Sequence, residues 1–402
     1  MTALTAMTEG AASTGALGAN RVAAVAGAGV GAVPVVDVGG WHAAVAPAAG
    51  TASRVPPVHH PDPASPSARR AAVACAIDLA SRDVGFFQIV GHGIDPRFVQ
   101  GALDAMDAFF ALPIEAKVAC LPPGPEVNRG YAPSGTEALS YSLGVDTPPD
   151  LLEAFIIGPD HPDLTDPAVR ATRDSVFAPN LWPDDLREMR VPLVRYFDAV
   201  SRLGHQLLEM CALALGLTPR HFVPFVSHST ETLRLNHYLR RPGDPGPSSG
   251  QMRLGAHTDY GILTLLHSDR VPGLELLGAD GTWHGVLPEP GAFIVNIGDL
   301  LAEWTNDRWR STVHRVVPPT TEGETAAFGA RRRSLAFFVD GNHDALIECL
   351  PTCASVGNPP RYAPILAGDH LLAKVLGGRT QDASRAAGAA DTLGDRRARV
   401  AD

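Results

Sequence analysis

A histidine and an aspartate stand two residues apart in the segment Arg253-Leu-Gly-Ala-His257-Thr-Asp259-Tyr-Gly, and together they could bind a metal ion. Residues two apart on a β-strand point to the same side, so an imidazole and a carboxylate would face one ion. His-x-Asp pairs of the chain include His60/Asp62, His257/Asp259 and His267/Asp269. Only the middle pair leads directly into a buried apolar run, 262–266, which makes it the best candidate.

Such a pair needs a third ligand. Two histidines and one carboxylate, with three open coordination positions, are the signature of non-haem Fe(II) oxygenases. The downstream candidates for the second histidine are His267, His284, His314, His343 and His370. His314 lies in the strand-like run 309–317, whereas His284 and His343 lie in turn-rich stretches. Taken singly, each of these histidines is more often structural than a ligand.

A basic run followed by a serine, Arg331-Arg-Arg-Ser334, could bind a carboxylate. An arginine fork binds a carboxylate through two hydrogen bonds, and a serine hydroxyl adds a third donor. Taken alone, the run is more simply a solvated basic stretch before a strand. If the run binds a carboxylate, the register of the serine selects Arg332 rather than Arg331 or Arg333.

The elements that would position these residues change character along the chain. In the first half we predict a strand over 33–38, a helix from an N-cap at Ser67 to Ser81, a buried strand over 86–90 and a helix over 193–215. After Leu233, short apolar runs alternate with Gly, Pro and Asp turns, at 233–238, 262–266, 274–277, 292–297, 312–317 and 334–339. A short helix, 300–304, would be capped by Asp299. This texture indicates a mainly β fold with flanking helices (α+β), built as a sandwich or barrel.

Five motifs in order resemble the isopenicillin N synthase-like family of Fe(II)- and 2-oxoglutarate-dependent dioxygenases. They are Asn236-His-Tyr238, His257-Thr-Asp259-Tyr-Gly, Asn296-Ile-Gly-Asp299, Ser311-Thr-Val-His314-Arg-Val and Arg332-Arg-Ser334-Leu-Ala-Phe-Phe. Segments 83–94, 109–117 and 128–131 also resemble the family, so the resemblance runs from about Val33 to Leu371. It implies a double-stranded β-helix (jelly roll) core with an N-terminal mixed helix/strand region. It also implies iron ligands and a 2-oxoglutarate site, namely His257, Asp259 and His314 for iron and Arg332, Ser334, Tyr238 and Asn236 for 2-oxoglutarate.

The resemblance further implies an oxidoreductase that uses Fe(II), O2 and 2-oxoglutarate, stimulated by ascorbate, to oxidise a small molecule. Hydroxylation with release of succinate and CO2 is the simplest outcome, and no side-chain general base is expected. Two alternatives stay open: an oxidase that closes rings or desaturates without 2-oxoglutarate, and a non-catalytic ligand-binding member. Substrate contacts are expected among five residues, each more often a packing residue: Tyr131, Phe155, Trp304, Phe338 and His343.

Composition limits the remaining function classes. The chain has 402 residues with 33 Lys+Arg and 43 Asp+Glu, a net charge of −10, which argues against nucleic-acid and anionic-membrane partners. No apolar run approaches the length of a membrane span, and the first residues do not form a signal peptide. Five scattered cysteines suit reduced thiols in a cytoplasmic protein. The composition, rich in Ala, Gly, Pro and Arg, is typical of a GC-rich bacterial genome, where enzymes of the family that this chain resembles often act in specialised metabolism such as antibiotic biosynthesis. The sequence gives no indication of an oligomeric state.

Composition and motifs divide the chain into five regions. We expect a disordered Ala/Gly-rich tail over 1–32 and an N-terminal dioxygenase region over 33–228 that contains a Pro-rich insert at about 46–66. The jelly-roll core would span 229–346, followed by a C-terminal segment over 347–376 that packs on the core. Residues 377–402 would form a flexible tail.

Overall fold

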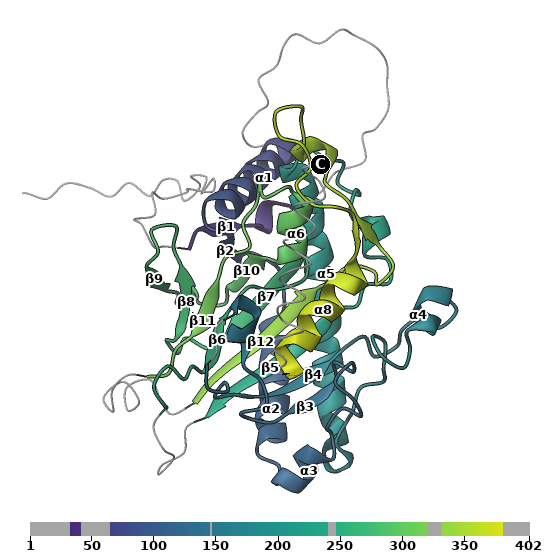
Figure 1. The fold of residues 1–402 in the computed structure, drawn as a ribbon, viewed down its shortest axis with the longest axis vertical. Coiled ribbons are helices and arrows are strands. Elements are labelled where there is room, and N and C mark those ends of the chain that lie inside the picture. The colour runs from purple at the N-terminus through teal and green to yellow at the C-terminus, as the bar shows by residue number, and fades with distance from the viewer. Residues whose placement is uncertain (1–32, 42–64, 145–146, 240–246, 320–330, 381–402) are drawn as a thin grey trace, which may run out of the picture.

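The computed structural model describes residues 33–41, 65–144, 147–239, 247–319 and 331–380 (Figure 1). The predicted tail over 1–32 and nearly all of the Pro-rich insert lie outside the described residues. Of the predicted C-terminal tail, residues 381–402 lie outside them as well. Residues 377–380 belong to the helix α8, Ala367–Thr380, so this helix continues past the predicted end of the C-terminal segment.

Two β-sheets form the centre of the molecule. The larger has eight strands in the order β1-β2-β10-β7-β12-β5-β4-β3, and the smaller has four in the order β6-β11-β8-β9. From β5 to β12 the chain passes repeatedly between the two sheets, as a double-stranded β-helix requires. The predicted jelly-roll core is therefore confirmed. The larger sheet consists of β1 (Val35–Asp37), β2 (Phe86–Val90), β3 (Gly130–Ala132), β4 (Glu153–Ile157), β5 (Thr232–Leu239), β7 (Leu263–Ser268), β10 (Phe293–Ile297) and β12 (Arg331–Val339).

The smaller sheet consists of β6 (Leu254–His257), β8 (Leu274–Leu277), β9 (Trp283–Gly285) and β11 (His314–Val316). A separate pair, β13 (Leu346–Ile347) and β14 (Ile365–Leu366), follows the core. All six predicted apolar runs correspond to strands, namely β5, β7, β8, β10, β11 and β12. The strands β3, β4, β9, β13 and β14 were not predicted.

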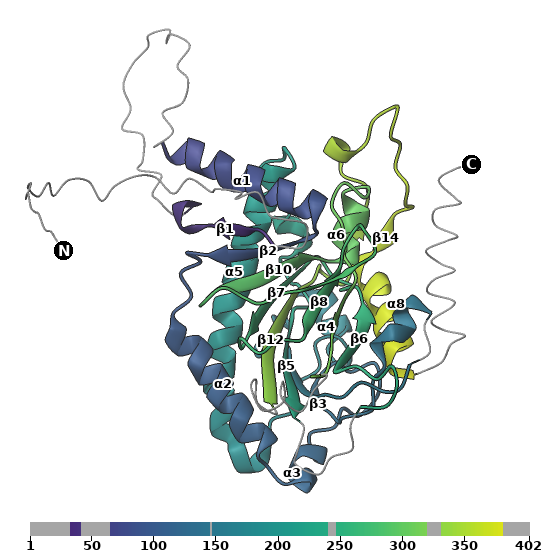
Figure 2. The same ribbon diagram turned by 90° about the vertical axis from the view of Figure 1, so that its left-hand side faces the viewer.

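Helices cover the larger sheet on the side away from the smaller one. The helices α1 (Pro66–Asp83), α2 (Pro96–Phe110) and α5 (Arg190–Ala214) pack together there, and α8 lies on the opposite side of the strands (Figure 2). The N-cap of α1 is Ser65, whose hydroxyl accepts from the backbone N–H of Ala68, with Pro66 in the first turn. The predicted cap at Ser67 is wrong, because proline fits the first helical position and so moves the cap before it.

The remaining helices are short. They are α3 (Ile114–Val118), α4 (Pro167–Ala171) and α6 (Asp299–Trp304), with 3-10 turns at Gly39–Trp41, Leu139–Leu143, Asp184–Met189, Val223–Phe225 and Pro351–Cys353. The N-cap of α6 is Gly298, which has no side chain that could accept a hydrogen bond from the first turn. Asp299 does not cap α6, because its carboxylate accepts instead from the Thr258 hydroxyl at 3.0 Å and from the Lys374 ammonium at 2.9 Å.

The apolar core has two parts. The larger lies between the eight-stranded sheet and the helices, and it includes the fully buried Phe87, Phe109, Leu193 and Leu233. A smaller cluster lies between the two sheets and includes Phe86, Leu276 and Val316. Because the second cluster fills only part of the space between the sheets, the jelly roll retains an internal cavity.

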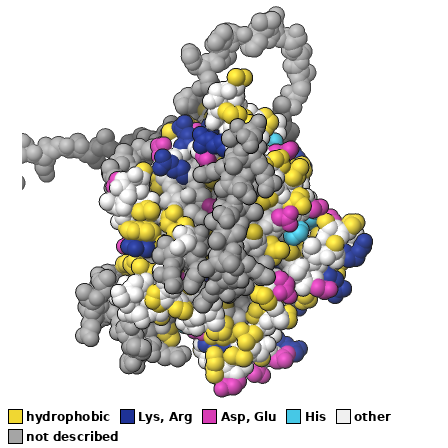
Figure 3. Space-filling view, viewed as in Figure 1, with side chains coloured by type: hydrophobic (Ala, Val, Ile, Leu, Met, Phe, Trp, Pro, Cys, Tyr) yellow, Lys and Arg dark blue, Asp and Glu magenta, His cyan; other side chains and the backbone are white. Residues whose placement is uncertain are grey.

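On the face drawn in Figure 3, acidic and basic side chains are interspersed among hydrophobic ones. Within the described part of the chain, the helices are all too short or too polar to cross a membrane.

Candidate metal centre

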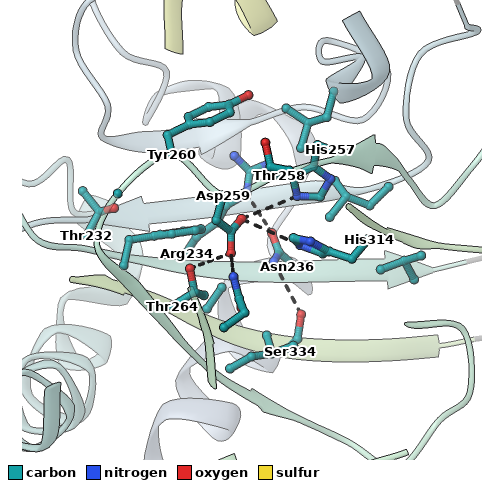
Figure 4. Close-up of a pocket in the computed structure, with 18 of the residues that line it drawn as sticks. Thr232, Arg234, Asn236, His257, Thr258, Asp259, Tyr260, Thr264, His314 and Ser334 are labelled. Carbon is teal, nitrogen blue, oxygen red and sulfur yellow. Dashed lines mark hydrogen bonds and ion pairs between the residues drawn. The ribbon is translucent and has the colours of Figure 1, made fainter. Parts of the chain in front are cut away.

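The chain brings His257, Asp259 and His314 together inside the jelly roll. Their potential ligand atoms all lie within 4.8 Å of one another, and each side chain is buried. The Nε2 atoms of His257 and His314 are each 3.7 Å from Oδ1 of Asp259 (Figure 4). No other group of at least three His, Cys, Asp or Glu side chains in the described ranges is arranged in this way.

Strand pairing and a turn, rather than a shared strand face, bring the three ligands together. His257 ends β6, and His314 begins β11 directly opposite it in the ladder of the smaller sheet. Asp259 lies beyond the strand, in the connection to β7, so a shared strand face does not bring His257 and Asp259 together. Cross-strand pairing places the two imidazoles side by side, and the turn after β6 brings the carboxylate to them.

Both imidazoles are oriented by backbone carbonyls. Nδ1 of His257 lies 2.7 Å from the carbonyl oxygen of Gly255, and Nδ1 of His314 lies 3.1 Å from that of Thr312. When Nδ1–H donates to a carbonyl, the Nε2 lone pair is free to bind a metal. Burial lowers the pKa of His257 to about 4, with the neighbouring His314 adding to the effect, so this imidazole is neutral at pH 7.

The two oxygens of Asp259 have separate partners. Oδ2 accepts from the Thr264 hydroxyl and from the Asn296 amide, each at 2.6 Å, while Oδ1 faces the two histidines. Burial would raise the pKa of Asp259, but the imidazoles of His314 and His257 and these two hydrogen bonds hold it below its usual value. Two neutral imidazole nitrogens and one carboxylate oxygen are the donor set of a non-haem Fe(II) site.

Asn296 and Thr264 had no predicted role, although both occupy segments that the sequence marks. Asn296 lies in one of the five family motifs, and Thr264 interrupts the apolar run that follows Asp259. A single polar residue inside such a run was the signal for Thr264.

A cavity extends from the three ligands to a buried arginine. Arg332 is 2 % exposed and lies opposite Tyr238 across β12 and β5, with its guanidinium carbon 5.2 Å from the centre of the tyrosine ring. Its Nη2 donates to the Ser268 hydroxyl at 2.9 Å, and its Nε donates to the Val271 carbonyl at 3.4 Å. Ser334 and Asn236 pair two residues further along, and they also line the cavity.

The neighbours of Arg332 in sequence point the other way, as the serine register predicts. Arg331 and Arg333 both form ion pairs with Asp107, at 3.0 Å and 2.7 Å. The inward position is therefore that of Arg332 alone among the three arginines.

A second buried guanidinium lies near Arg332. Arg253 is 4 % exposed, and within the described part of the chain its Nη2 has no hydrogen-bond partner. Burial lowers the pKa of Arg253, and the positive charge of Arg332 lowers it further. Neither guanidinium forms an ion pair with a carboxylate among the residues that the structure describes. Buried charges are normally paired, so this end of the cavity suits an anionic ligand.

The five candidate substrate residues lie in different places. Phe338 lines the cavity, at the next inward-facing position of β12 after Ala336. The others are not among the residues that line it. Tyr131 donates its hydroxyl to Glu153 at 2.8 Å, and the ring of Phe155 packs 4.3 Å from that of Phe109.

Trp304 and His343 likewise pack elsewhere. The Trp304 ring lies between those of Phe222 and Phe225, at 5.0 and 4.8 Å, and His343 lies against the backbone of Gly368. Phe338 is thus the one candidate whose position supports substrate contact.

Four polar residues that the sequence analysis did not consider line the cavity. They are Glu137, Thr232, Arg234 and Asp340. Arg234 donates to Asn236 at 2.8 Å and forms an ion pair with Glu137. The two-residue alternation of side chains along a strand would have identified three of the four. Thr232 and Arg234 precede Asn236 by even numbers of residues, and Asp340 follows Ser334 by an even number. Glu137 comes from a loop, so no strand pattern marks it.

Comparison with known proteins gives a consistent result. A family model described as the 2OG-Fe(II) oxygenase superfamily matches residues 229–341, and one described as the N-terminal region of a non-haem dioxygenase in morphine synthesis matches residues 57–185. The chain is 37% identical over 294 residues to the 2-oxoglutarate-Fe(II) type oxidoreductase hxnY of Emericella nidulans, covering 71% of this chain and 78% of that protein.

Two further matches extend over most of the chain. Validamycin A dioxygenase of Streptomyces hygroscopicus subsp. limoneus is 32% identical over 348 residues, covering 86% of each protein. The crystal structure of a full-length Neurospora crassa protein in complex with alpha-KG and thymine superposes with a TM-score of 0.68 at 28% identity, covering 85% of this chain and 96% of that one. The chain therefore belongs to the 2OG-Fe(II) oxygenase superfamily and is a 2-oxoglutarate-dependent oxidoreductase that uses Fe(II).

Proposed function

We propose that His257, Asp259 and His314 bind the catalytic Fe(II). One observation carries this proposal: three ligand atoms, two from the end of β6 and the turn after it and one from the start of β11, lie within 4.8 Å of one another and face a cavity. The hydrogen bonds to His257 Nδ1, His314 Nδ1 and Asp259 Oδ2 leave one donor atom of each residue free for the metal. Bound Fe(II) supplies the redox chemistry that couples decarboxylation of 2-oxoglutarate to substrate oxidation.

Arg332, Ser334, Tyr238 and Asn236 bind 2-oxoglutarate in this proposal. Guanidinium groups carry five N–H donors, and the two hydrogen bonds of Arg332 to Ser268 and Val271 leave donors for the distal carboxylate of the co-substrate. Ser334 adds a hydroxyl, while the Tyr238 ring holds the guanidinium in place. Asn236 lies between this end and the metal ligands, with its amide directed at Ser334 at 3.4 Å.

The reaction is the hydroxylation of a small molecule. Substrate R–H, O2 and 2-oxoglutarate give R–OH, succinate and CO2. One atom of O2 enters R–OH and the other enters succinate. The protein orients the C–H bond, excludes water through the apolar walls of the cavity, and needs no side-chain base. The names of the relatives favour this reaction over the alternatives of an oxidase without 2-oxoglutarate and of a non-catalytic binding protein. A relative that acts on validamycin A also supports a specialised metabolite as the substrate.

The test is succinate formation from 2-oxoglutarate, Fe(II) and ascorbate, with candidate substrates screened by mass spectrometry for the gain of one oxygen. We expect substrate-dependent succinate release, stimulation by ascorbate, and loss of both products in the His257→Ala variant. Full activity in that variant, or no succinate with any substrate, would show that the proposal is wrong.

We also propose that the enzyme works in the cytoplasm. The five cysteines are all described, and all are free thiols, as a reducing compartment allows.

A further inference from the structure

The floor of the cavity is built from alternate residues of two paired strands. On β12 these are Arg332, Ser334, Ala336 and Phe338, and on β5 they are Tyr238, Asn236, Arg234 and Thr232. Each residue of the first set lies opposite its counterpart in the second, and all eight line the cavity. The floor is thus a series of cross-strand rows, with successive rows about 7 Å apart because every second residue faces inward.

These rows place the metal ligands relative to the two ends of the floor. The row of Phe338 continues across β7 and β10 to Thr264 and Asn296, the two residues that hold Asp259. Arg332 lies three rows away on one side of it. On the other side one more inward position remains, that of Asp340. If the proposed function is right and 2-oxoglutarate occupies the Arg332 side, the substrate occupies the side of Phe338 and Asp340.

Asp340 is a buried carboxyl group that has no partner among the residues described by the structure. It is 5 % exposed and lines the cavity, yet it makes no hydrogen bond or ion pair with the described residues. Its Oδ1 packs against Gly261, where any larger residue would place a Cβ in contact with the carboxylate. Burial raises the pKa of Asp340 to about 7, and the negative charges of Glu231 and Asp259 add to this effect.

The neighbouring charges do not compensate Asp340. Glu231 has its own partners, the Ser201 hydroxyl at 2.7 Å and the His205 imidazole at 3.1 Å. Arg234, which lies one row nearer to Arg332 than Phe338 does, is paired with Glu137. The substrate end therefore has one acidic group in excess, in a place where an unpaired charge is costly.

We propose that the substrate carries a basic amine, which binds as an ammonium ion to Asp340 while its carbon skeleton lies on Phe338. This inference rests on the proposed function, since it takes the opposite end of the cavity as the 2-oxoglutarate site. The Thr232 hydroxyl, opposite Phe338, offers a further hydrogen bond to a polar substituent. Apolar side chains complete the wall around the skeleton: Leu139, Ile156 and Leu371.

The experiment compares amines with neutral partners of the same shape. Cyclohexylamine and cyclohexanol, and benzylamine and benzyl alcohol, are titrated calorimetrically into the full chain loaded with Mn(II) and 2-oxoglutarate without O2. An ionic hydrogen bond in a buried site makes the amines bind at least about tenfold more tightly than the alcohols. The variant Asp340→Asn loses this preference. The control Asp344→Asn keeps it, because Asp344 is exposed and pairs with His228 outside the cavity.

Three results would overturn the inference: alcohols that bind as tightly as the amines, amines that do not bind, and an Asp340→Asn variant that keeps the preference. Thermal melting of both variants separates misfolding from a lost contact. The 2-oxoglutarate titration that precedes each experiment reports on the proposed function separately. Normal 2-oxoglutarate binding without amine preference refutes the substrate class alone, whereas failure to bind 2-oxoglutarate refutes the proposed function.

Discussion

Replacing Arg332 by methionine tests the co-substrate site. Methionine is unbranched and apolar, so Arg332→Met removes the charge and the N–H donors while keeping most of the packing against Tyr238. The two hydrogen bonds of Arg332 to Ser268 and Val271 would be lost, although both partners are neutral acceptors. The main effect should therefore fall on the anion that the guanidinium binds.

The magnitude follows from the burial of the site. Truncating one partner of a buried, hydrogen-bonded charge pair costs about 2–5 kcal/mol. Affinity for 2-oxoglutarate should accordingly fall by at least about thirtyfold, since about 1.4 kcal/mol corresponds to a tenfold change. The unliganded variant should be more stable to unfolding than the wild type, because it lacks a buried guanidinium that pairs with no described carboxylate.

The assay is a calorimetric titration of 2-oxoglutarate into the Mn(II)-loaded protein, together with the KM for 2-oxoglutarate in succinate formation. Arg331→Gln is the matched control: Arg331 is adjacent on β12 but exposed and paired with Asp107, so its variant should change the affinity by less than about twofold. Wild-type affinity in Arg332→Met, or an equal loss in Arg331→Gln, would refute the reasoning.

Three further predictions concern the metal site and the fold around it. Thr264→Val removes the hydroxyl that donates to Asp259 and should weaken Mn(II) binding by about tenfold or more, measured by electron paramagnetic resonance; unchanged binding would argue against this role. Adding Mn(II) at about a hundredfold excess over its Kd should stabilise the protein by about 2.7 kcal/mol, and Asp259→Ala should abolish the gain in thermal melting. Burial alone would raise the pKa of Glu153, but hydrogen bonds from His237, Lys117 and Tyr131 outweigh it and hold this pKa at about 2, below its ordinary 4.5. The lowered pKa contributes about 3 kcal/mol of stability above pH 4.5, and this contribution is lost as the pH falls towards 2. In denaturant titrations the free energy of unfolding of Glu153→Gln should therefore fall less steeply between pH 4.5 and 2 than that of the wild type.

Much of the jelly roll could be predicted because its central strands are long enough to show a pattern. The run that became β5 alternates inward polar residues with mainly apolar outward ones, and in β12 the register of Ser334 selected Arg332 from three arginines. The choice of His314 from five histidines rested on a family resemblance. The structure supplies the physical reason, the ladder contact between His314 and His257.

The rest depended on contacts between distant segments. Glu137 reaches the cavity only because its loop folds onto Arg234 of β5, and Asp299 turns away from its helix end because Thr258 and Lys374 offer it donors. Such pairings leave no periodic signal in the chain. Four of the five aromatic or histidine candidates for substrate contact do not line the cavity, and a buried ring has the same sequence signature in a core as in a pocket wall.

A crystal structure of the protein with Mn(II) and 2-oxoglutarate, grown without O2, tests the central claim most directly. The account predicts a single metal ion bound to Nε2 of His257, Oδ1 of Asp259 and Nε2 of His314, with the distal carboxylate of 2-oxoglutarate on Arg332 and Ser334. A metal held by other residues, or a co-substrate whose carboxylate lies away from Arg332, would contradict it.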